Sequence, residues 1–161
     1  MVIVFPLGLL STAFAFDIAY AIMGRGVFTV LAYWLIPAGL VSGVVAAVFG
    51  WIDWMAIPRD TRARSIGLIH GSVNALVLLL FLGSWMFRPN SLSNPGTASL
   101  VLSIAGAGLA LVGGWLGGEL VERLGVGVHP GANPNAPNSL TTDAASDRTS
   151  KVGTNEAETY R

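Results

Sequence analysis

Apolar residues form long uncharged runs along this chain, and short polar segments separate the runs. Three of them cover residues 27–52, 66–87 and 98–118. Each reaches the ~18 to 20 residues that a helix needs to cross the ~30 Å hydrocarbon core of a bilayer. A soluble helical bundle would carry a polar stripe at 3.6-residue spacing on each helix, and these runs have none. The pattern therefore predicts membrane-spanning helices.

A fourth run covers residues 2–23 and contains one charged residue, Asp17. An Asp in the middle of a span costs ~2.5 to 3.5 kcal/mol on insertion scales, whereas each Val, Ile, Leu or Phe returns ~0.3 to 0.6 kcal/mol. Insertion is therefore still favoured. The alternative is a signal peptide cleaved after Ala13-Phe14-Ala15, but the run has no basic segment before it and continues to Met23.

The connections between these runs, residues 24–26, 53–65 and 88–97, are short enough to make successive helices antiparallel neighbours. We therefore expect an all-α integral membrane bundle of four transmembrane helices in up-down-up-down order. The transmembrane domain covers residues 1–128, with spans at about 2–23, 27–52, 66–87 and 98–121. Residues 129–161 are rich in Pro, Asn, Ser, Thr and Asp, which predicts a polar, disordered cytoplasmic tail.

The composition supports a membrane class, since 53% of the residues are hydrophobic and only 11% are charged. Soluble domains carry roughly 25% charged residues. The absence of Cys excludes disulfides, thiolate zinc sites and Cys-ligated iron–sulfur clusters. The net charge is zero, and no basic cluster points to nucleic acid as a partner.

Basic residues near the span ends predict the orientation in the membrane. One side holds Arg59, Arg62, Arg64 and Arg123, whereas the other holds only Arg25 and Arg88. Because the cytoplasmic side of a membrane protein carries the excess of Arg and Lys, both termini are expected in the cytoplasm.

Glycines recur at four-residue spacing in the second and fourth spans. The pairs are Gly39 with Gly43, Gly113 with Gly117, and Gly114 with Gly118. Small residues at this interval let another helix backbone approach closely, which matters in lipid because apolar side chains alone give little reason to associate. We expect these glycines to form helix-packing faces, within the bundle or in a homo-oligomer.

Polar residues of three spans are expected to share one layer near the cytoplasmic side. The candidates for this polar layer are Asp53, Arg59, Arg62, Arg64, His70, Asn74 and Glu119. One interpretation is a network of salt bridges and hydrogen bonds that joins the helix ends. The other is a pocket in which His70, with Glu119 or Asp53, binds a ligand, metal, proton or cofactor. The carboxylates near helix C-termini, Asp53, Glu119 and Glu122, should each have a cationic partner.

Asp17 lies nearer the opposite leaflet, and we expect Tyr20 or Arg25 as its partner. Its alternative role is in a proton relay or a small transporter, but no titratable group lies between Asp17 and the polar layer. None of the spans is expected to be broken or interrupted by proline at its middle, as transporter helices often are.

Haem or metal binding is weakly indicated by the histidines. A b-type haem needs two axial ligands, usually His, and His70 is the only histidine inside a span, so it is also the only in-span candidate for a metal. His129 would have to fold back over the bundle. No phosphate-binding glycine loop and no Ser nucleophile with a nearby base are recognisable, so an enzymatic activity is not indicated.

Several motifs together resemble a known family. They are FPLGLL at residues 5–10, FD at 16–17, GWIDW at 50–54 with IPR at 57–59, HG at 70–71 with Asn74, and GWLGGELV at 114–121 with GVGV at 125–128. In this order they resemble the bacterial four-span membrane domain of unknown function twenty-two thirty-one, over the chain to about residue 140.

The resemblance implies a bacterial inner-membrane protein without an established activity. Relatives joined to Rieske-type or cytochrome modules imply a redox setting. Many members carry a His-Pro-x-x-His-Pro segment directly before the position that matches Met1, and these histidines would lie on the same side as His70; upstream codons for His-Pro would indicate a start site assigned too late. We therefore expect an accessory or assembly element of the membrane, with a haem- or metal-binding redox subunit and a small transporter or channel as alternatives.

Overall fold

The computed structural model describes residues 2–88, 94–129, 131–134 and 136. Contacts divide the chain into two units, Met1–Leu124 and Gly125–Arg161. All the helices of the described residues belong to the first unit. The tail predicted for residues 129–161 lies largely outside the described residues, which include only 129, 131–134 and 136 of it.

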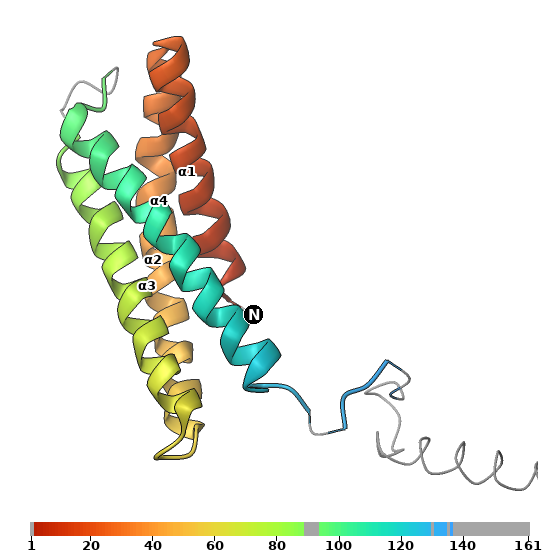
Figure 1. Ribbon diagram of the computed structural model, residues 1–161. Helices are drawn as coiled ribbons and strands as arrows, with labels where there is room; N and C mark the ends of the chain where they lie inside the picture. The colour runs from red at the N-terminus through yellow and green to blue at the C-terminus, as the bar shows by residue number, and fades with distance from the viewer. Residues whose placement is uncertain (1, 89–93, 130, 135, 137–161) are drawn as a thin grey trace, which may run out of the picture. The chain divides into compact units, whose positions relative to one another are not determined.

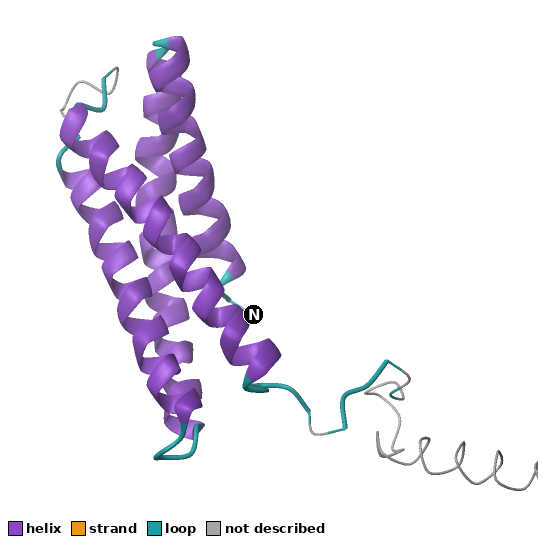
Figure 2. Cartoon of the chain, viewed as in Figure 1, coloured by secondary structure: helices purple, strands orange, loops and turns teal. Residues whose placement is uncertain are grey.

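Helices make up almost all of the first unit. They are α1 (Val4–Met23), α2 (Gly26–Ala56), α3 (Arg62–Met86) and α4 (Thr97–Gly118), and a π-helical turn, η1 (Glu119–Arg123), continues α4 (Figures 1 and 2). Four helices are long and apolar enough to cross a membrane, counting η1 with α4. The described residues contain no strand. The predicted all-α membrane bundle of four helices is confirmed.

The connection between α2 and α3 is shorter than predicted, because both helices extend beyond their apolar runs. α2 continues past residue 52 and ends before Ile57, whose backbone is extended (φ −71°, ψ 130°). The residue before a proline is driven to this conformation, and Pro58 follows. α3 begins four residues before the predicted span because Thr61 caps it, its hydroxyl accepting a hydrogen bond of 3.2 Å from the Arg64 N–H.

Two prolines lie inside helices without breaking them. Pro6 is the third residue of α1, where a backbone N–H would have no partner within the helix. Pro37 lies in the middle of α2, which is assigned as one continuous helix from Gly26 to Ala56. α2 is therefore unbroken, but the expectation that no span carries a proline at its middle is wrong for α2, where Pro37 removes one helical hydrogen bond.

Consecutive helices lie side by side in the bundle. The most extensive contacts join α1 with α2 and α3 with α4; α2 and α3 share fewer, and α1 and α4 fewer still. Figure 1 shows the chain reversing direction between neighbours, and the short connection after α1 is closed by Gly24 at φ 67°, a conformation that glycine adopts freely. The up-down-up-down order across a bilayer stays a prediction, because no membrane is present.

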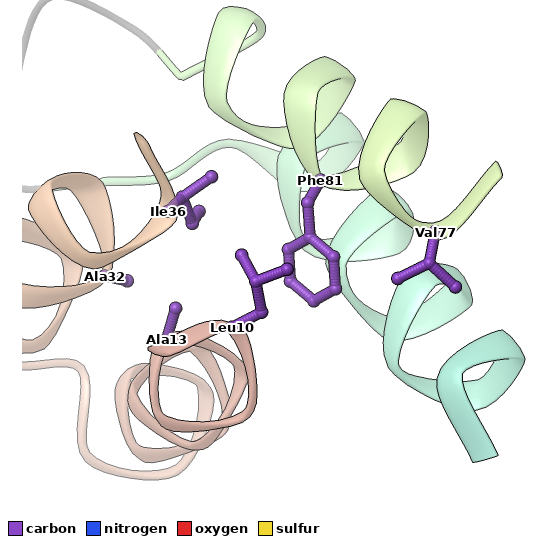
Figure 3. Close-up of a cluster of buried hydrophobic side chains, with 6 residues drawn as sticks. All are labelled: Leu10, Ala13, Ala32, Ile36, Val77 and Phe81. Atoms are coloured by element: carbon purple, nitrogen blue, oxygen red, sulfur yellow. The ribbon is translucent and has the colours of Figure 1, made fainter. Parts of the chain in front are cut away.

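The interior of the bundle is a small apolar cluster. Leu10 and Ala13 of α1, Ala32 and Ile36 of α2, and Val77 and Phe81 of α3 are buried against one another (Figure 3). Large apolar side chains are instead abundant on the outside, as on α4, where Leu111 is 78% exposed. Exposed apolar area on this scale is unfavourable in water, so the outer faces of the helices are suited to lipid.

Glycines allow the helices to approach closely at several points. A Cβ on Gly39 would lie 2.6 Å from Leu10 Cδ2, and one on Gly43 would lie 2.6 Å from Leu78 Cδ2. Gly106 is similarly placed on α4, because its Cβ would lie 3.0 Å from two ring carbons of Phe81. These contacts are tighter than a side chain can accept without displacing its neighbour.

The bundle therefore predicts different effects for two glycines of the same helix. Leu at Gly106 should lower the free energy of unfolding by about 1 to 3 kcal/mol, because it overpacks the contact with Phe81. Leu at Gly108, whose Cβ would meet nothing within 4 Å, should leave the stability unchanged. Thermal unfolding of the two variants in detergent measures the difference, and equal melting temperatures would contradict the packing described for Gly106.

Candidate functional site

Glu119 is the centre of an ion-pair cluster where α4 passes into η1. Arg62 at the start of α3 donates a hydrogen bond of 2.7 Å from Nη2 to Glu119 Oε1, and Arg123 Nε lies 3.6 Å from Oε2. The Glu119 side chain is only 9% exposed, whereas those of Arg62 and Arg123 are 62% and 75% exposed. The carboxylate is thus largely buried, whereas both of its cationic partners are exposed. The Arg62 hydrogen bond connects the start of α3 to the end of α4.

His70 and Asn74 of α3 form a second cluster, which contacts the backbone of α4. His70 Nδ1 lies 3.0 Å from the Gly113 carbonyl oxygen, so its N–H donates there in the tautomer that fits this contact. The Asn74 amide nitrogen lies 3.0 Å from His70 Nε2 and donates to the His70 carbonyl at the same distance. Both ring nitrogens of His70 are therefore engaged between α3 and α4.

Arg64 forms a third cluster, which holds the connection between α2 and α3. Its Nη1 donates a hydrogen bond of 2.7 Å to the Ile57 carbonyl, and its guanidinium lies 4.2 Å from the centre of the Trp54 ring. Trp54 Nε1 in turn donates to the Arg64 carbonyl at 2.9 Å. These contacts fold the end of α2 back onto the start of α3 and involve no carboxylate.

The predicted polar layer is thus divided into separate clusters. Within the described residues, no hydrogen bond or ion pair joins the Glu119, His70 and Arg64 clusters. Asp53 and Arg59 are exposed and take part in none of them. The expectation that every carboxylate near a helix C-terminus has a cationic partner is right for Glu119. It is wrong, among the residues that the structure describes, for Asp53 and Glu122, which are exposed and accessible to solvent or headgroups.

Asp17 and Arg88 form an ion pair inside the opposite end of the bundle. Arg88 Nη2 donates to both carboxylate oxygens of Asp17, at 2.9 Å to Oδ1 and 2.7 Å to Oδ2. Both side chains are only 1% exposed. An unpaired charge buried to this extent would carry a large desolvation penalty, so each residue makes the burial of the other possible.

The expectation that Tyr20 or Arg25 is the partner of Asp17 is therefore wrong. Arg88 follows the end of α3 and folds back into the bundle, because that end of α3 lies at the same level as the last turns of α1. Arg25 is exposed beyond the end of α1. The sequence signal for this pair was the opposite charge of Arg88 at the same end of the bundle. Sequence reasoning placed Arg88 only in the connection after α3.

The Ser84 hydroxyl lies beside the Asp17–Arg88 pair. Ser84 donates a hydrogen bond of 2.8 Å to the Ser99 carbonyl, which ties α3 to α4, and it lies 3.5 Å from Arg88 Nη2. Buried side chains of α2 and α4 add three more hydroxyls, Thr29, Ser99 and Ser103. Within the described part of the chain, these three oxygens and Arg88 Nε and Nη1 have no hydrogen-bond partner. Ser84 therefore links the ion pair to the backbone of α4.

The polar side chains of these clusters are engaged in contacts within the bundle. No group of three or more His, Cys, Asp or Glu that could hold a metal is found among the described residues. Axial ligation of haem by His70 would require Asn74 to release Nε2, which it contacts at 3.0 Å. Asp17 accepts two hydrogen bonds from the guanidinium of Arg88.

Comparison with known proteins adds a family assignment and no activity. The family model described as "Predicted membrane protein (DUF2231)" matches residues 1–130. No curated protein and no solved structure matches the chain.

The buried pair predicts a mutational signature of its own. Asp17→Asn and Arg88→Met should each lower stability by about 3 to 5 kcal/mol, because each leaves a buried charge without its partner. A double variant, Asp17→Leu with Arg88→Met, removes both charges and should recover most of the loss. Thermal unfolding in detergent measures these three proteins and the single variant Asp17→Leu. A double variant whose loss equals the sum of those of Asp17→Leu and Arg88→Met alone would show that the two charges do not interact.

Proposed function

The chain belongs to the DUF2231 family of predicted membrane proteins, and we propose that it is an accessory or assembly element of the bacterial inner membrane. In this role it contributes a stable four-helix scaffold and associates with a further transmembrane helix through α4. The proposal is supported by which groups the bundle uses internally and which it leaves on its outer surface.

The observation that carries the proposal is the different surroundings of two overlapping glycine pairs. A Cβ on Gly113 would lie 2.9 Å from Asn74 Oδ1, and one on Gly117 would lie 3.2 Å from His70 Cε1, so this pair packs against α3. The other pair, Gly114 and Gly118, is displaced by one residue. A Cβ at either position would meet nothing within 4 Å.

Packing within the chain therefore accounts for the first pair and leaves the second without a role. Gly108 of the same helix is also open, but Gly114 and Gly118 are four residues apart and so share one face. Glycines four residues apart form a shallow groove in which a second transmembrane helix packs closely. We assign this face of α4 to association, with a second copy of the chain as the partner and a membrane complex as the alternative.

The charge distribution supports cytoplasmic termini. At the end where α2 connects to α3, Arg59, Arg62 and Arg123 are exposed and Arg64 is half-buried, so all four lie at or near the surface. At the other end Arg88 is buried and paired with Asp17, so Arg25 is the exposed arginine there within the described residues. The asymmetry that determines orientation is therefore larger than a count of arginines along the sequence suggests.

A substitution series on α4 tests the association face. Leu at Gly114 or Gly118 should abolish self-association while leaving the melting temperature of the monomer unchanged, because the side chain projects where nothing else packs. Leu at Gly113 or Gly117 should instead lower the melting temperature. Energy transfer between labelled copies in liposomes reports association, with Gly108→Leu as the control for an open glycine outside the pair. Energy transfer that persists in both Gly114→Leu and Gly118→Leu would refute this role of the face.

Single cysteines test the orientation, because the natural chain contains no Cys. An impermeant maleimide applied to intact spheroplasts should label Thr97→Cys, at the start of α4, and should label Ser65→Cys, in the first turn of α3, only after permeabilisation. The arginines near Ser65 are the reason for this expectation. Labelling of Ser65→Cys from outside would invert the assignment.

A further inference from the structure

A groove lies beside the ion-pair cluster of Glu119, on the outer side of the turn η1. Its walls are formed by Arg62, Trp115, Gly118, Glu119, Glu122 and Arg123, and its volume is about 390 Å³. Small-molecule sites have volumes of roughly 300 to 1,000 Å³, so the groove is large enough for a polar group of modest size. It is open to the surroundings of the protein and is formed by described residues of the first unit alone.

The groove presents positive and negative charge side by side. Arg123 is 75% exposed, and among the described residues its charged contact is the 3.6 Å approach of Nε to Glu119. Arg62 is also largely exposed, and within the same part of the chain its hydrogen bond is made through Nη2. Glu122 is exposed and belongs to none of the ion pairs in the described part of the chain.

The position of the groove places these charges at the membrane surface. α4 ends at Gly118, which lines the groove, and Trp115, one turn earlier on the same wall, is exposed. Trp is enriched at the boundary between hydrocarbon and headgroups. A ligand in the groove would therefore have its charged part beside η1 and an apolar part along Trp115 and the outer face of α4.

We propose that this groove binds the headgroup of a phospholipid that carries a primary ammonium, of the phosphatidylethanolamine type. The phosphodiester accepts hydrogen bonds from Arg62 and Arg123, and the ammonium donates to the Glu122 carboxylate. Arginine suits the phosphate because its planar guanidinium presents several N–H donors to one oxyanion. This site goes beyond the proposed function, since association of α4 with another helix does not require a bound lipid, although Gly118 belongs to both surfaces.

Charge complementarity favours this headgroup over two common alternatives. A phosphatidylglycerol headgroup would satisfy the arginines but leave Glu122 beside an added negative charge. A phosphatidylcholine headgroup has no N–H to donate to Glu122, because its ammonium is fully methylated. The groove has both a cationic and an anionic wall, so it fits a headgroup that has both charges and a hydrogen-bond donor.

Native mass spectrometry of the full chain in detergent tests the proposal, with phosphatidylethanolamine, phosphatidylcholine and phosphatidylglycerol added in separate titrations. The unaltered protein should retain phosphatidylethanolamine more tightly than phosphatidylcholine by roughly tenfold, which corresponds to ~1.4 kcal/mol. Glu122→Gln should remove this preference, and Arg123→Gln should weaken the binding of all three lipids. Arg25→Gln, which changes an exposed arginine outside the groove, is the matched control and should behave like the unaltered protein.

Three outcomes would overturn the assignment. They are equal retention of phosphatidylethanolamine and phosphatidylcholine by the unaltered protein, a preference for phosphatidylglycerol, and an unchanged preference in Glu122→Gln. The comparison among lipids on the unaltered protein needs no substitution, so it decides the question even where a variant folds poorly. A negative result leaves the association face on α4 unaffected, because that face is tested by energy transfer between copies.

Discussion

The ion pair between Asp17 and Arg88 is the constraint on which the rest of the bundle depends. Both side chains are 1% exposed, and α1 ends only six residues after Asp17, about 9 Å along the helix axis. A lone Asp or Arg in a span costs ~2.5 to 3.5 kcal/mol at the centre of a membrane, so neither residue is tolerated well without the other. The pair therefore fixes the depth of α1 against the end of α3. Ser84 extends the same connection to α4 through the Ser99 carbonyl.

At the opposite end of the bundle, arginines at or near the surface join the helix ends. Arg62, 62% exposed, reaches Glu119 across the gap between α3 and α4, and Arg64 holds the connection between α2 and α3 through the Ile57 carbonyl and the Trp54 ring. An ion pair with an exposed partner, such as Arg62–Glu119, contributes typically ~0.2 to 1 kcal/mol, so it adjusts the helix ends and does not determine the fold. Because their charges remain accessible, they are also the groups that can meet a headgroup.

Hydrophobic pattern was sufficient to predict the four helices, because the length of the apolar runs depends on bilayer thickness and not on neighbouring helices. It could not predict where α2 and α3 end, since the Thr61 cap and the extended Ile57 before Pro58 act within a polar segment. Depth along each span could also be estimated, and it correctly assigned Arg62 and Glu119 to the same end. The side of the helix on which a residue lies could not be estimated. The polar layer was therefore expected to form one network, whereas the structure divides it into separate clusters.

The glycines of α4 show the same limitation, because Gly113 and Gly114 are adjacent in sequence but about 100° apart around the helix. Only the position of α3 shows that Gly113 and Gly117 are used inside the bundle. The buried ion pair, the His70–Asn74 contacts and this glycine pair all join helices of one chain. What remains on the outside is apolar surface, an open glycine pair and a charged groove at the membrane boundary. A molecule whose buried charges are committed to its own helices acts through its surface, so the outer face of α4 and the turn η1 are where partners and lipids are expected to bind.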